Sequence, residues 1–242
     1  MDYIYLKENR ASLKPDSKNK KIFAGIFFAF GFFLFTSAIF PIVQFQLEYS
    51  RQFEKILNPL SSKFYNHTGS ILGNLSSTDY TQLNNWFIAD NTAESSTISI
   101  LSDSPTSSYR ISIPVLKITD AIVEVGSLDL KKSLIQYPKT ALPGQPGNGV
   151  IFGHSVLPQF FNPRSYLTIF STLYRLKQGD EVYVDYDNIR YKYLVEEMYE
   201  VQPTDLSVLE QRYDGRYFSL NTCSPPGTYL RRLVVKTRLA DI

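Results

Sequence analysis

The feature that most constrains this chain is one uninterrupted apolar stretch near its beginning. Residues 22–43 are 22 consecutive residues without a charge, and they would span about 33 Å as a helix at about 1.5 Å per residue. That length crosses the hydrocarbon core of a bilayer. A cleaved signal peptide is the alternative, but the stretch is too long for its apolar region and no small-residue cleavage pattern follows. We therefore expect an uncleaved transmembrane helix at 22–43.

The charges on the two sides of this stretch are asymmetric. Four lysines closely precede it, namely Lys14, Lys18, Lys20 and Lys21. After it come Glu48 and a single nearby base, Arg51. Because basic flanking residues stay on the cytoplasmic side of a membrane, we expect residues 1–21 in the cytoplasm. The rest of the chain is then extracytoplasmic, and the protein is a single-pass protein of the cell membrane.

Beyond the apolar stretch, the chain has room for one globular domain of roughly 130 residues, a usual domain size. Its Tyr and Phe residues, 17 of each against one Trp and two Met, favour a β-rich fold. The 25 basic and 23 acidic residues are interspersed. The sequence therefore lacks the basic patch that marks nucleic-acid-binding proteins.

Residues 44–108 are rich in Ser, Thr and Asn, and we interpret them as an extracytoplasmic spacer. Residues 45–57 could continue the helix out of the membrane, and 95–108 have the composition of a solvated linker. His67 lies among polar loop-forming residues, so it carries little weight as a functional residue.

The texture of the sequence changes at about residue 110. Short runs of β-branched and aromatic residues, separated by Gly and Pro, indicate an all-β sandwich or barrel over 109–242. Strands are expected at 110–113, 121–125, 149–153, 180–185, 190–201, 216–222 and 232–239. Short helical turns are expected at 128–133, 163–167 and 206–209.

Cys223 is the only cysteine, so it forms no internal disulfide and is either an intermolecular partner or a reactive group. With two His residues in the chain, a structural zinc site is poorly supplied, and we expect neither a metal nor a cofactor. Strand alternation puts Phe218 and Leu220 on the core face and Cys223 on the other, just before a Pro-Pro-Gly loop. An inert buried thiol is the alternative. The place at a strand end, against a loop, favours a reactive one.

The strand after that loop brings a cation to the same end. Alternation turns Leu233 and Val235 inward and Arg232 outward. If the two segments are neighbouring strands, Cys223 and Arg232 approach each other, and the guanidinium favours a thiolate and can donate to a developing oxyanion. Arg231 faces the other way and is the weaker candidate. For either Arg, a solvated strand end is the alternative.

His154 ends an apolar run that reads as a buried strand, and Gly153 before it permits close approach of the backbone. A lone His is more often a hydrogen-bonded structural residue. Beyond the spacer, however, the chain holds only this His and only Cys223, and a Cys nucleophile typically needs such a base.

Together these residues resemble the sortase family. Residues 221–235, Asn-Thr-Cys-Ser-Pro-Pro-Gly-Thr-Tyr-Leu-Arg-Arg-Leu-Val-Val, are similar to its signature of Thr-Cys, a short loop, and Arg before an aliphatic strand. Residues 111–118 resemble its opening strand, and 140–154 resemble the stretch that leads to its catalytic His. Residues 176–180, which are followed by an expected strand, also match the order of segments along a sortase sequence. The resemblance covers about residues 110 to 240 and assigns no class within the family.

The resemblance implies a closed, mostly eight-stranded β-barrel and a cysteine transpeptidase that cleaves a Leu-Pro-x-Thr-Gly-like sorting signal near the C-terminus of a secreted protein. It implies that Cys223 attacks the Thr carbonyl, that His154 protonates the leaving amine, and that Arg232 stabilises the oxyanion or positions the peptide. The acyl group then passes to an amine of a cell-wall precursor or a pilin lysine, which anchors the secreted protein at the cell surface. Thr222 and Asn221 are expected to support the site or to bind substrate.

The spacer lacks the Asp-Pro-aromatic lid motif of many pilin-assembling sortases, and no second apolar segment closes the chain, so pilus assembly is less favoured than a cell-wall-anchoring or general role. The main alternative is a non-catalytic, membrane-tethered β-barrel domain that binds a surface partner, with Cys223 merely buried. An L,D-transpeptidase also uses Cys and His. It is disfavoured because Leu-Asn-Thr precedes Cys223 here, whereas the pattern of those enzymes has Ser-x-Gly before the nucleophilic Cys.

Overall fold

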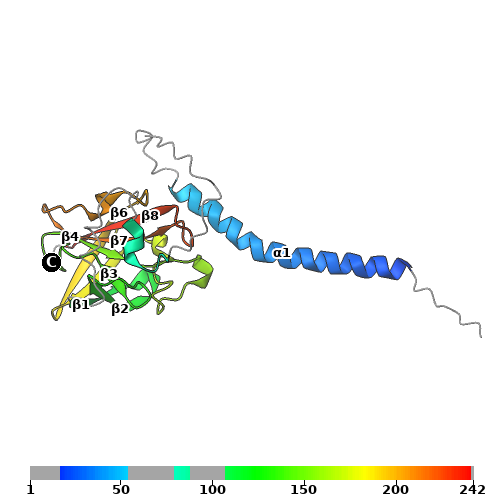
Figure 1. The fold of residues 1–242 in the computed structure, drawn as a ribbon, viewed down its shortest axis with the longest axis horizontal. Helices are drawn as coiled ribbons and strands as arrows, with labels where there is room; N and C mark the ends of the chain where they lie inside the picture. Colours follow the sequence, from blue (N-terminus) through cyan, green and yellow to red (C-terminus); the bar gives the residue numbers. More distant parts are fainter. Residues whose placement is uncertain (1–16, 54–78, 88–106, 241–242) are drawn as a thin grey trace, which may run out of the picture. The chain divides into compact units, whose positions relative to one another are not determined.

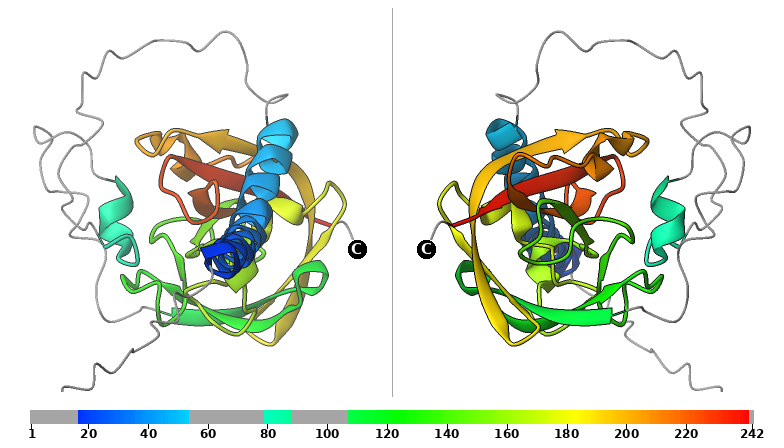
Figure 2. Two further views of the ribbon diagram at one scale, coloured as in Figure 1. Left: turned by 90° about the vertical axis from the view of Figure 1, so that its right-hand side faces the viewer. Right: turned by 90° about the vertical axis from the view of Figure 1, so that its left-hand side faces the viewer.

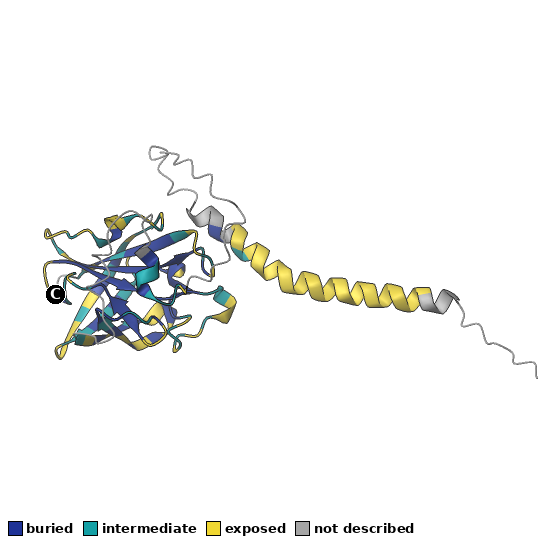
Figure 3. Ribbon diagram, in the orientation of Figure 1, coloured by how far each residue is buried: buried dark blue, intermediate teal, exposed yellow. Residues whose placement is uncertain are grey.

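The computed structural model describes residues 17–53, 79–87 and 107–240, and the chain divides into two compact units. The first contains helix α1 (Ser17–Phe53) (Figure 1). Its segment Lys21–Leu47 has a mean hydropathy of 2.3 and is long and apolar enough to cross a membrane. The side chains of this segment are almost all exposed (Figure 3), as expected of a helix that meets lipid. Lys14 and His67 lie outside the described residues.

The second unit is built on a closed β-barrel, with strands in the order β1-β2-β3-β4-β7-β8-β6-β5 (Figure 2). The strands are β1 (Ser107–Ile113), β2 (Ile118–Val125), β3 (Leu134–Gln136), β4 (Gly147–Phe152), β5 (Glu181–Tyr186), β6 (Ile189–Val201), β7 (Arg216–Ser224) and β8 (Arg231–Leu239). Short 3-10 helices connect them: η4 (Pro114–Leu116), η5 (Pro158–Phe160), η6 (Leu173–Arg175) and η7 (Leu206–Leu209). The barrel closes where β5 pairs with β1, which removes every open sheet edge.

The expected eight-stranded barrel is confirmed, and each strand expected from the sequence is present with somewhat different ends. The sequence pattern missed β3, which is only three residues long and buried on both faces, so it has no alternation to detect. The helical turn expected at 206–209 is η7. Those expected at 128–133 and 163–167 are wrong, because these segments form turns without helical repeats.

Aromatic side chains from three strands fill the interior of the barrel. The ring of Phe218 on β7 is met edge-on by Tyr109 of β1 at 6.2 Å between centroids and by Tyr193 of β6 at 4.9 Å. Burying a side chain of this size stabilises the fold by about 2–3 kcal/mol. Because alternate residues of β7 face opposite ways, Phe218 and Leu220 point inward while Cys223 points outward.

The outer face of β4 and β7 is also covered, by an apolar cluster that includes residues from outside the barrel. This outer apolar cluster consists of Leu83, Trp86, Leu130, Ile135, Tyr137, Val150, Phe152 and Cys223. Strands β4 and β7 are accordingly buried along both faces. They pair in parallel, so their carboxyl ends meet at the same edge of the sheet, where the chain continues into His154 and Cys223.

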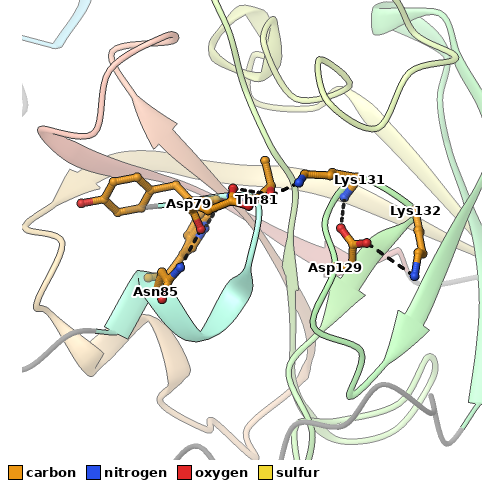
Figure 4. Close-up of polar contacts among 8 residues, drawn as sticks. Asp79, Thr81, Asn85, Asp129, Lys131 and Lys132 are labelled. Atoms are coloured by element: carbon orange, nitrogen blue, oxygen red, sulfur yellow. Dashed lines mark hydrogen bonds and ion pairs between the residues drawn. The ribbon is translucent and has the colours of Figure 1, made fainter. Parts of the chain in front are cut away.

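Part of the stretch expected to be a spacer packs on this face. Residues 79–87, which we call the cover segment, end in the 3-10 helix η2 (Leu83–Phe87). Backbone hydrogen bonds join the segment to the turn between β2 and β3, from Leu83 N to Leu128 O and from Leu130 N to Thr81 O, both 2.9 Å. Asp79 contacts Lys131 on that turn at 3.3 Å (Figure 4). The cover segment is therefore part of the folded unit.

Candidate active site

Cys223 lies near the end of β7 and is 1% exposed. Its thiol belongs to the outer apolar cluster with Trp86 and Phe152. Burial disfavours the thiolate, so the pKa of Cys223 is raised to about 11, although the charge of Arg232 acts to lower it. In this covered state the thiol is protonated at neutral pH.

Arg232 stands directly opposite Cys223 in the antiparallel pairing of β7 with β8. Its Nη1 lies 3.6 Å from Cys223 Sγ and also donates to the carbonyl of Arg231 at 3.3 Å. The side chain is 5% exposed, and among the described residues no carboxylate forms an ion pair with it. A buried cation of this kind is available to balance negative charge that develops on the sulfur or on a bound carbonyl oxygen.

Arg231 points to the opposite face, as alternation predicts. Its guanidinium lies 3.5 Å from the carboxylate of Glu200 on β6, which also accepts a hydrogen bond from the Ser224 hydroxyl. This group ties the ends of β6, β7 and β8 together. The two adjacent arginines therefore have different surroundings, and only Arg232 meets the thiol.

His154 follows β4 in line with Cys223. The parallel pairing of β4 with β7 keeps a constant offset of 69 residues and ends at Phe152 and Asn221. Extending the same offset by two residues would place the backbone of His154 next to that of Cys223. His154 Nδ1 lies 2.7 Å from the Leu167 carbonyl, which can only accept, so Nδ1 carries the proton. Nε2 is then the ring nitrogen that can accept a proton.

Burial is the main influence on His154 and lowers the pKa of its imidazole. The hydrogen bond to Leu167 and the carboxylate of Asp79 oppose this effect, whereas Lys131 adds to it. With the pKa of Cys223 raised and that of His154 lowered, the neutral pair of thiol and imidazole predominates under the cover segment. Access of solvent shifts both groups toward the thiolate and imidazolium.

Three hydrogen bonds fix the backbone around these two side chains. Gly153 N donates to Asn221 O at 3.0 Å, Thr222 Oγ1 donates to Gly153 O at 2.8 Å, and Ser155 Oγ donates to Cys223 O at 3.1 Å. A Cβ at Gly153 would lie 2.3 Å from the ring of Phe170. Only glycine fits at this exit from β4, which explains its place before His154.

The two supporting residues expected from the sequence lie in different environments. Thr222 is fully buried on the inward face, where it holds the carbonyl beside His154. Asn221 lies on the outward face, two residues before Cys223, and is 1% exposed. Its side-chain amide nitrogen donates to Ile151 O and Ser219 O.

Aromatic side chains of the cover segment lie over the cation. The Arg232 Cζ is 4.7 Å from the ring centroid of Trp86 and 5.9 Å from that of Tyr80. Tyr80 stacks on Tyr229 of the loop between β7 and β8 at 4.1 Å. Trp86 Nε1 donates to Tyr80 O at 2.7 Å, which holds the two ends of the segment together. Because Cys223 is 1% exposed, a ligand can reach the thiol only if side chains that cover it move.

The comparisons with known proteins agree with this geometry. The family model described as the sortase domain matches residues 111–240, more than half of the chain. The chain belongs to the sortase family. Its sortase domain runs from β1 to β8 and contains His154, Cys223 and Arg232, whereas the cover segment precedes the matched region. A search of curated proteins found no match.

Solved sortase structures of several types are similar to this chain. Sortase C-1 from Actinomyces oris is 27% identical, with a TM-score of 0.49 over 55% of this chain and 73% of that one. A lid mutant of sortase A from Corynebacterium diphtheriae is 27% identical, with a TM-score of 0.49 over 58% and 73%. A sortase D5 transpeptidase from Clostridium perfringens is 23% identical, with a TM-score of 0.48 over 60% and 86%.

Sequence reasoning missed Tyr80, Trp86 and the Leu167 carbonyl as neighbours of this sortase site. For the cover segment a signal exists in hindsight: the only Trp of the chain follows Leu83 by three residues, the spacing that puts two side chains on one face of a helical turn. No sequence pattern could have predicted the contact with the Leu167 carbonyl, because every residue has a backbone carbonyl. Among the described residues, no group of three or more His, Cys, Asp or Glu could hold a metal ion.

Proposed function

We propose that this sortase is a membrane-anchored cysteine transpeptidase that acts on secreted proteins carrying a Leu-Pro-x-Thr-Gly-like sorting signal. The observation that carries the proposal is the distance of 3.6 Å from Arg232 Nη1 to Cys223 Sγ, with His154 at the end of the adjacent parallel strand. A thiol can act as the nucleophile of acyl transfer, an imidazole as its acid and base, and a buried guanidinium as the donor that stabilises the oxyanion.

In the proposed reaction, His154 Nε2 takes the proton of the Cys223 thiol and the sulfur attacks the scissile carbonyl carbon. The oxyanion that forms is stabilised by Arg232. The C–N bond then breaks as the imidazolium protonates the leaving amine, which leaves a thioester on Cys223. An incoming amine attacks this thioester and gives a proton to His154 as the C–S bond breaks. The product is a new amide and the free enzyme.

The proposed setting follows from the two units of the chain. The apolar helix α1 anchors the enzyme, the lysines before it keep the N-terminus in the cytoplasm, and the catalytic domain, proposed to span 109–242, works outside the membrane. The acyl acceptor is an amine of a cell-wall precursor or a pilin lysine. Joining a secreted protein to it fixes that protein at the cell surface.

The test incubates the full-length chain in detergent with Leu-Pro-x-Thr-Gly-like peptides, with and without amines, and measures intact mass. A peptide acyl adduct on Cys223 that amines resolve into a transfer product supports the proposal. Cys223→Ala should abolish transfer, and His154→Ala should lower it by a factor of about 10³ or more. Transfer that persists in the Cys223→Ala variant would contradict the assignment.

One observation favours a second candidate, a non-catalytic binding domain: Cys223 is 1% exposed within an apolar cluster, as an inert cysteine is. The same experiment separates the two. A folded protein in which Cys223 forms no adduct and resists iodoacetamide even at alkaline pH, where a thiol of pKa about 11 begins to ionise, is a binding domain. A Cys223 that is alkylated but forms no adduct identifies the enzyme class with the wrong peptide.

A further inference from the structure

Asn221 is a buried polar residue close to Cys223. It lies on β7 two residues before Cys223 and on the same face. In the strand pairing it stands between Phe152 of β4 and Val234 of β8. Its side chain is 1% exposed. A carboxamide is therefore buried between two apolar neighbours, and Cys223 is the next residue of β7 on the same face.

The orientation of this carboxamide is determined by its partners. Nδ2 donates to Ile151 O at 3.3 Å and to Ser219 O at 3.0 Å. Both partners are carbonyl oxygens, which only accept, so the nitrogen has to face them. Oδ1 then points the other way, and within the described ranges no donor lies within hydrogen-bonding distance of it.

Other buried carboxamides in the same barrel are satisfied. Gln136 Oε1 accepts from the Tyr109 hydroxyl at 2.6 Å, and Asn148 Oδ1 accepts from Ser219 Oγ at 2.8 Å. Buried acceptors are normally paired because an unpaired one has lost its water without replacement. Asn221 departs from this rule at the one site where a ligand is expected.

The cover segment does not supply the missing donor. It brings Leu83 and Trp86 to the outer apolar cluster, and the indole nitrogen is already engaged with Tyr80 O. Asn84 of the same segment has a buried side-chain oxygen that also lacks a donor among the described residues. The segment helps to bury the site but supplies no donor to Asn221 Oδ1.

We infer that Asn221 Oδ1 accepts a hydrogen bond from the acyl-donor peptide when that peptide replaces the cover segment. This inference rests on the proposed transpeptidase function. Two residues of a strand, and two residues of an extended peptide beside it, both span about 6.6 Å. A donor about two residues from the scissile carbonyl therefore reaches Asn221 while that carbonyl lies at Cys223.

The consequence is selectivity for a peptide with an N–H or O–H group at that point. A peptide without the donor would leave Oδ1 buried and unpaired, which is how hydrogen-bonding sites reject analogues. The donor is either a backbone amide or a polar side chain. Asn221 is then a substrate-binding residue that determines specificity among sorting signals and takes no part in the chemical steps.

The experiment measures acylation of the full-length chain in detergent by peptide alone, so that no amine acceptor contributes. One set of peptides carries a single N-methylated amide at each position in turn, and a second set replaces each donor side chain by an apolar isostere. The wild type is compared with Asn221→Val, which suits a strand, and with Asn221→Ala in case valine prevents folding. Ser219→Ala, on the same strand and face one step farther from Cys223, is the matched control.

In the wild type, one modified position should lower the acylation rate by about 10-fold to 100-fold. This penalty should shrink to about 3-fold or less in the Asn221 variants and persist in Ser219→Ala. The set in which it occurs identifies a backbone or a side-chain donor. A merely structural Asn221 would slow all peptides equally and leave the penalty intact.

Equal penalties in wild type and both Asn221 variants would overturn the inference while the transpeptidase stands. If no peptide forms an acyl adduct and Cys223 also resists iodoacetamide at alkaline pH, the proposed function fails and the inference fails with it. If Cys223 is alkylated but no peptide forms an adduct, the peptide class is wrong, and the inference, which concerns that peptide, fails alone.

Discussion

The indole of Trp86 lies over the guanidinium of Arg232, with 4.7 Å between Cζ and the ring centroid. The same guanidinium is 3.6 Å from Cys223 Sγ. One aromatic side chain from outside the matched sortase domain therefore lies over the cation and packs in the same apolar cluster as the Cys223 thiol. We expect access to the thiol to depend on movement of this side chain.

Replacing Trp86 by Ala should expose Cys223. The substitution removes a large buried side chain, whose loss typically costs about 3–5 kcal/mol, and it removes the cation–π contact with Arg232. We expect the rate of iodoacetamide modification of Cys223 to rise by at least about 10-fold, the factor for 1.4 kcal/mol. Tyr213→Ala removes an aromatic ring that is 74% exposed and should leave the rate unchanged. An unchanged rate in Trp86→Ala would show that something else limits access.

The pH dependence of the same modification should report the pKa of Cys223. Because burial raises that pKa to about 11, the wild-type rate should climb about 10-fold per pH unit up to about pH 10 without reaching a plateau. In Trp86→Ala the pKa moves down toward its ordinary value, so the curve should flatten at lower pH. In Arg232→Ala the opposing positive charge is lost, and the rate at each pH should fall. A wild-type plateau near neutral pH would contradict this account.

Substitutions of the two adjacent arginines should have different effects on turnover. Arg232→Ala removes the group opposite Cys223, and loss of one preorganised oxyanion donor typically lowers turnover by about 10² to 10³. Arg231→Ala breaks an ion pair in which the Arg231 side chain is 36% exposed and that of Glu200 is 9% exposed, so it should lower stability. It removes no group that meets the thiol and should change the turnover of the folded protein by no more than about 3-fold. Steady-state kinetics of both variants on one peptide provide the measurement. Equal losses would mean that the two faces of β8 do not have separate roles.

His154 should make stability depend on pH in the acidic range. Burial lowers the pKa of its imidazole below the ordinary 6.5, so the unfolded state binds more protons there. The stabilisation is fully present above pH 6.5 and is lost as the pH falls through the lowered pKa. The Tm of the wild type should therefore fall more steeply from about pH 7.5 to about pH 5 than that of His154→Gln. Parallel Tm profiles would assign the acid sensitivity to other groups.

Much of the barrel could be predicted because its strands carry local signals. Alternation separated the inward Phe218 from the outward Cys223, and the loop between β7 and β8 brought Arg232 opposite the thiol. Gly153 signalled the close packing that sets His154 beside β7. Strand β3 gave no such signal, because a three-residue run that is buried on both faces has no period.

The burial of the site could not be predicted from the strand that carries it. The face of β7 that bears Ser219, Asn221 and Cys223 has the composition of a polar surface. It is buried because Trp86 and Leu83 arrive from a distant segment whose neighbours are mostly Ser, Thr and Asn. Composition averages over many residues, so a mostly polar stretch is interpreted as a spacer even when two apolar residues within it pack against the barrel.

Thr222 and Thr237 offer a matched test of what positions His154. Each is fully buried and donates its hydroxyl to a backbone carbonyl, Thr222 to Gly153 O at 2.8 Å and Thr237 to Phe218 O at 3.0 Å. Replacing either by Val leaves a buried carbonyl with one partner fewer, so both variants should lose about 1–2 kcal/mol in the free energy of unfolding. Of the two, only Thr222 bonds to the backbone next to His154.

Thr222→Val should therefore also lower acyl transfer by about 10-fold, since small displacements of a catalytic group are costly. Thr237→Val should retain wild-type turnover below its Tm. If both variants lose activity in proportion to stability, the hydroxyl of Thr222 supports the barrel and does not position His154.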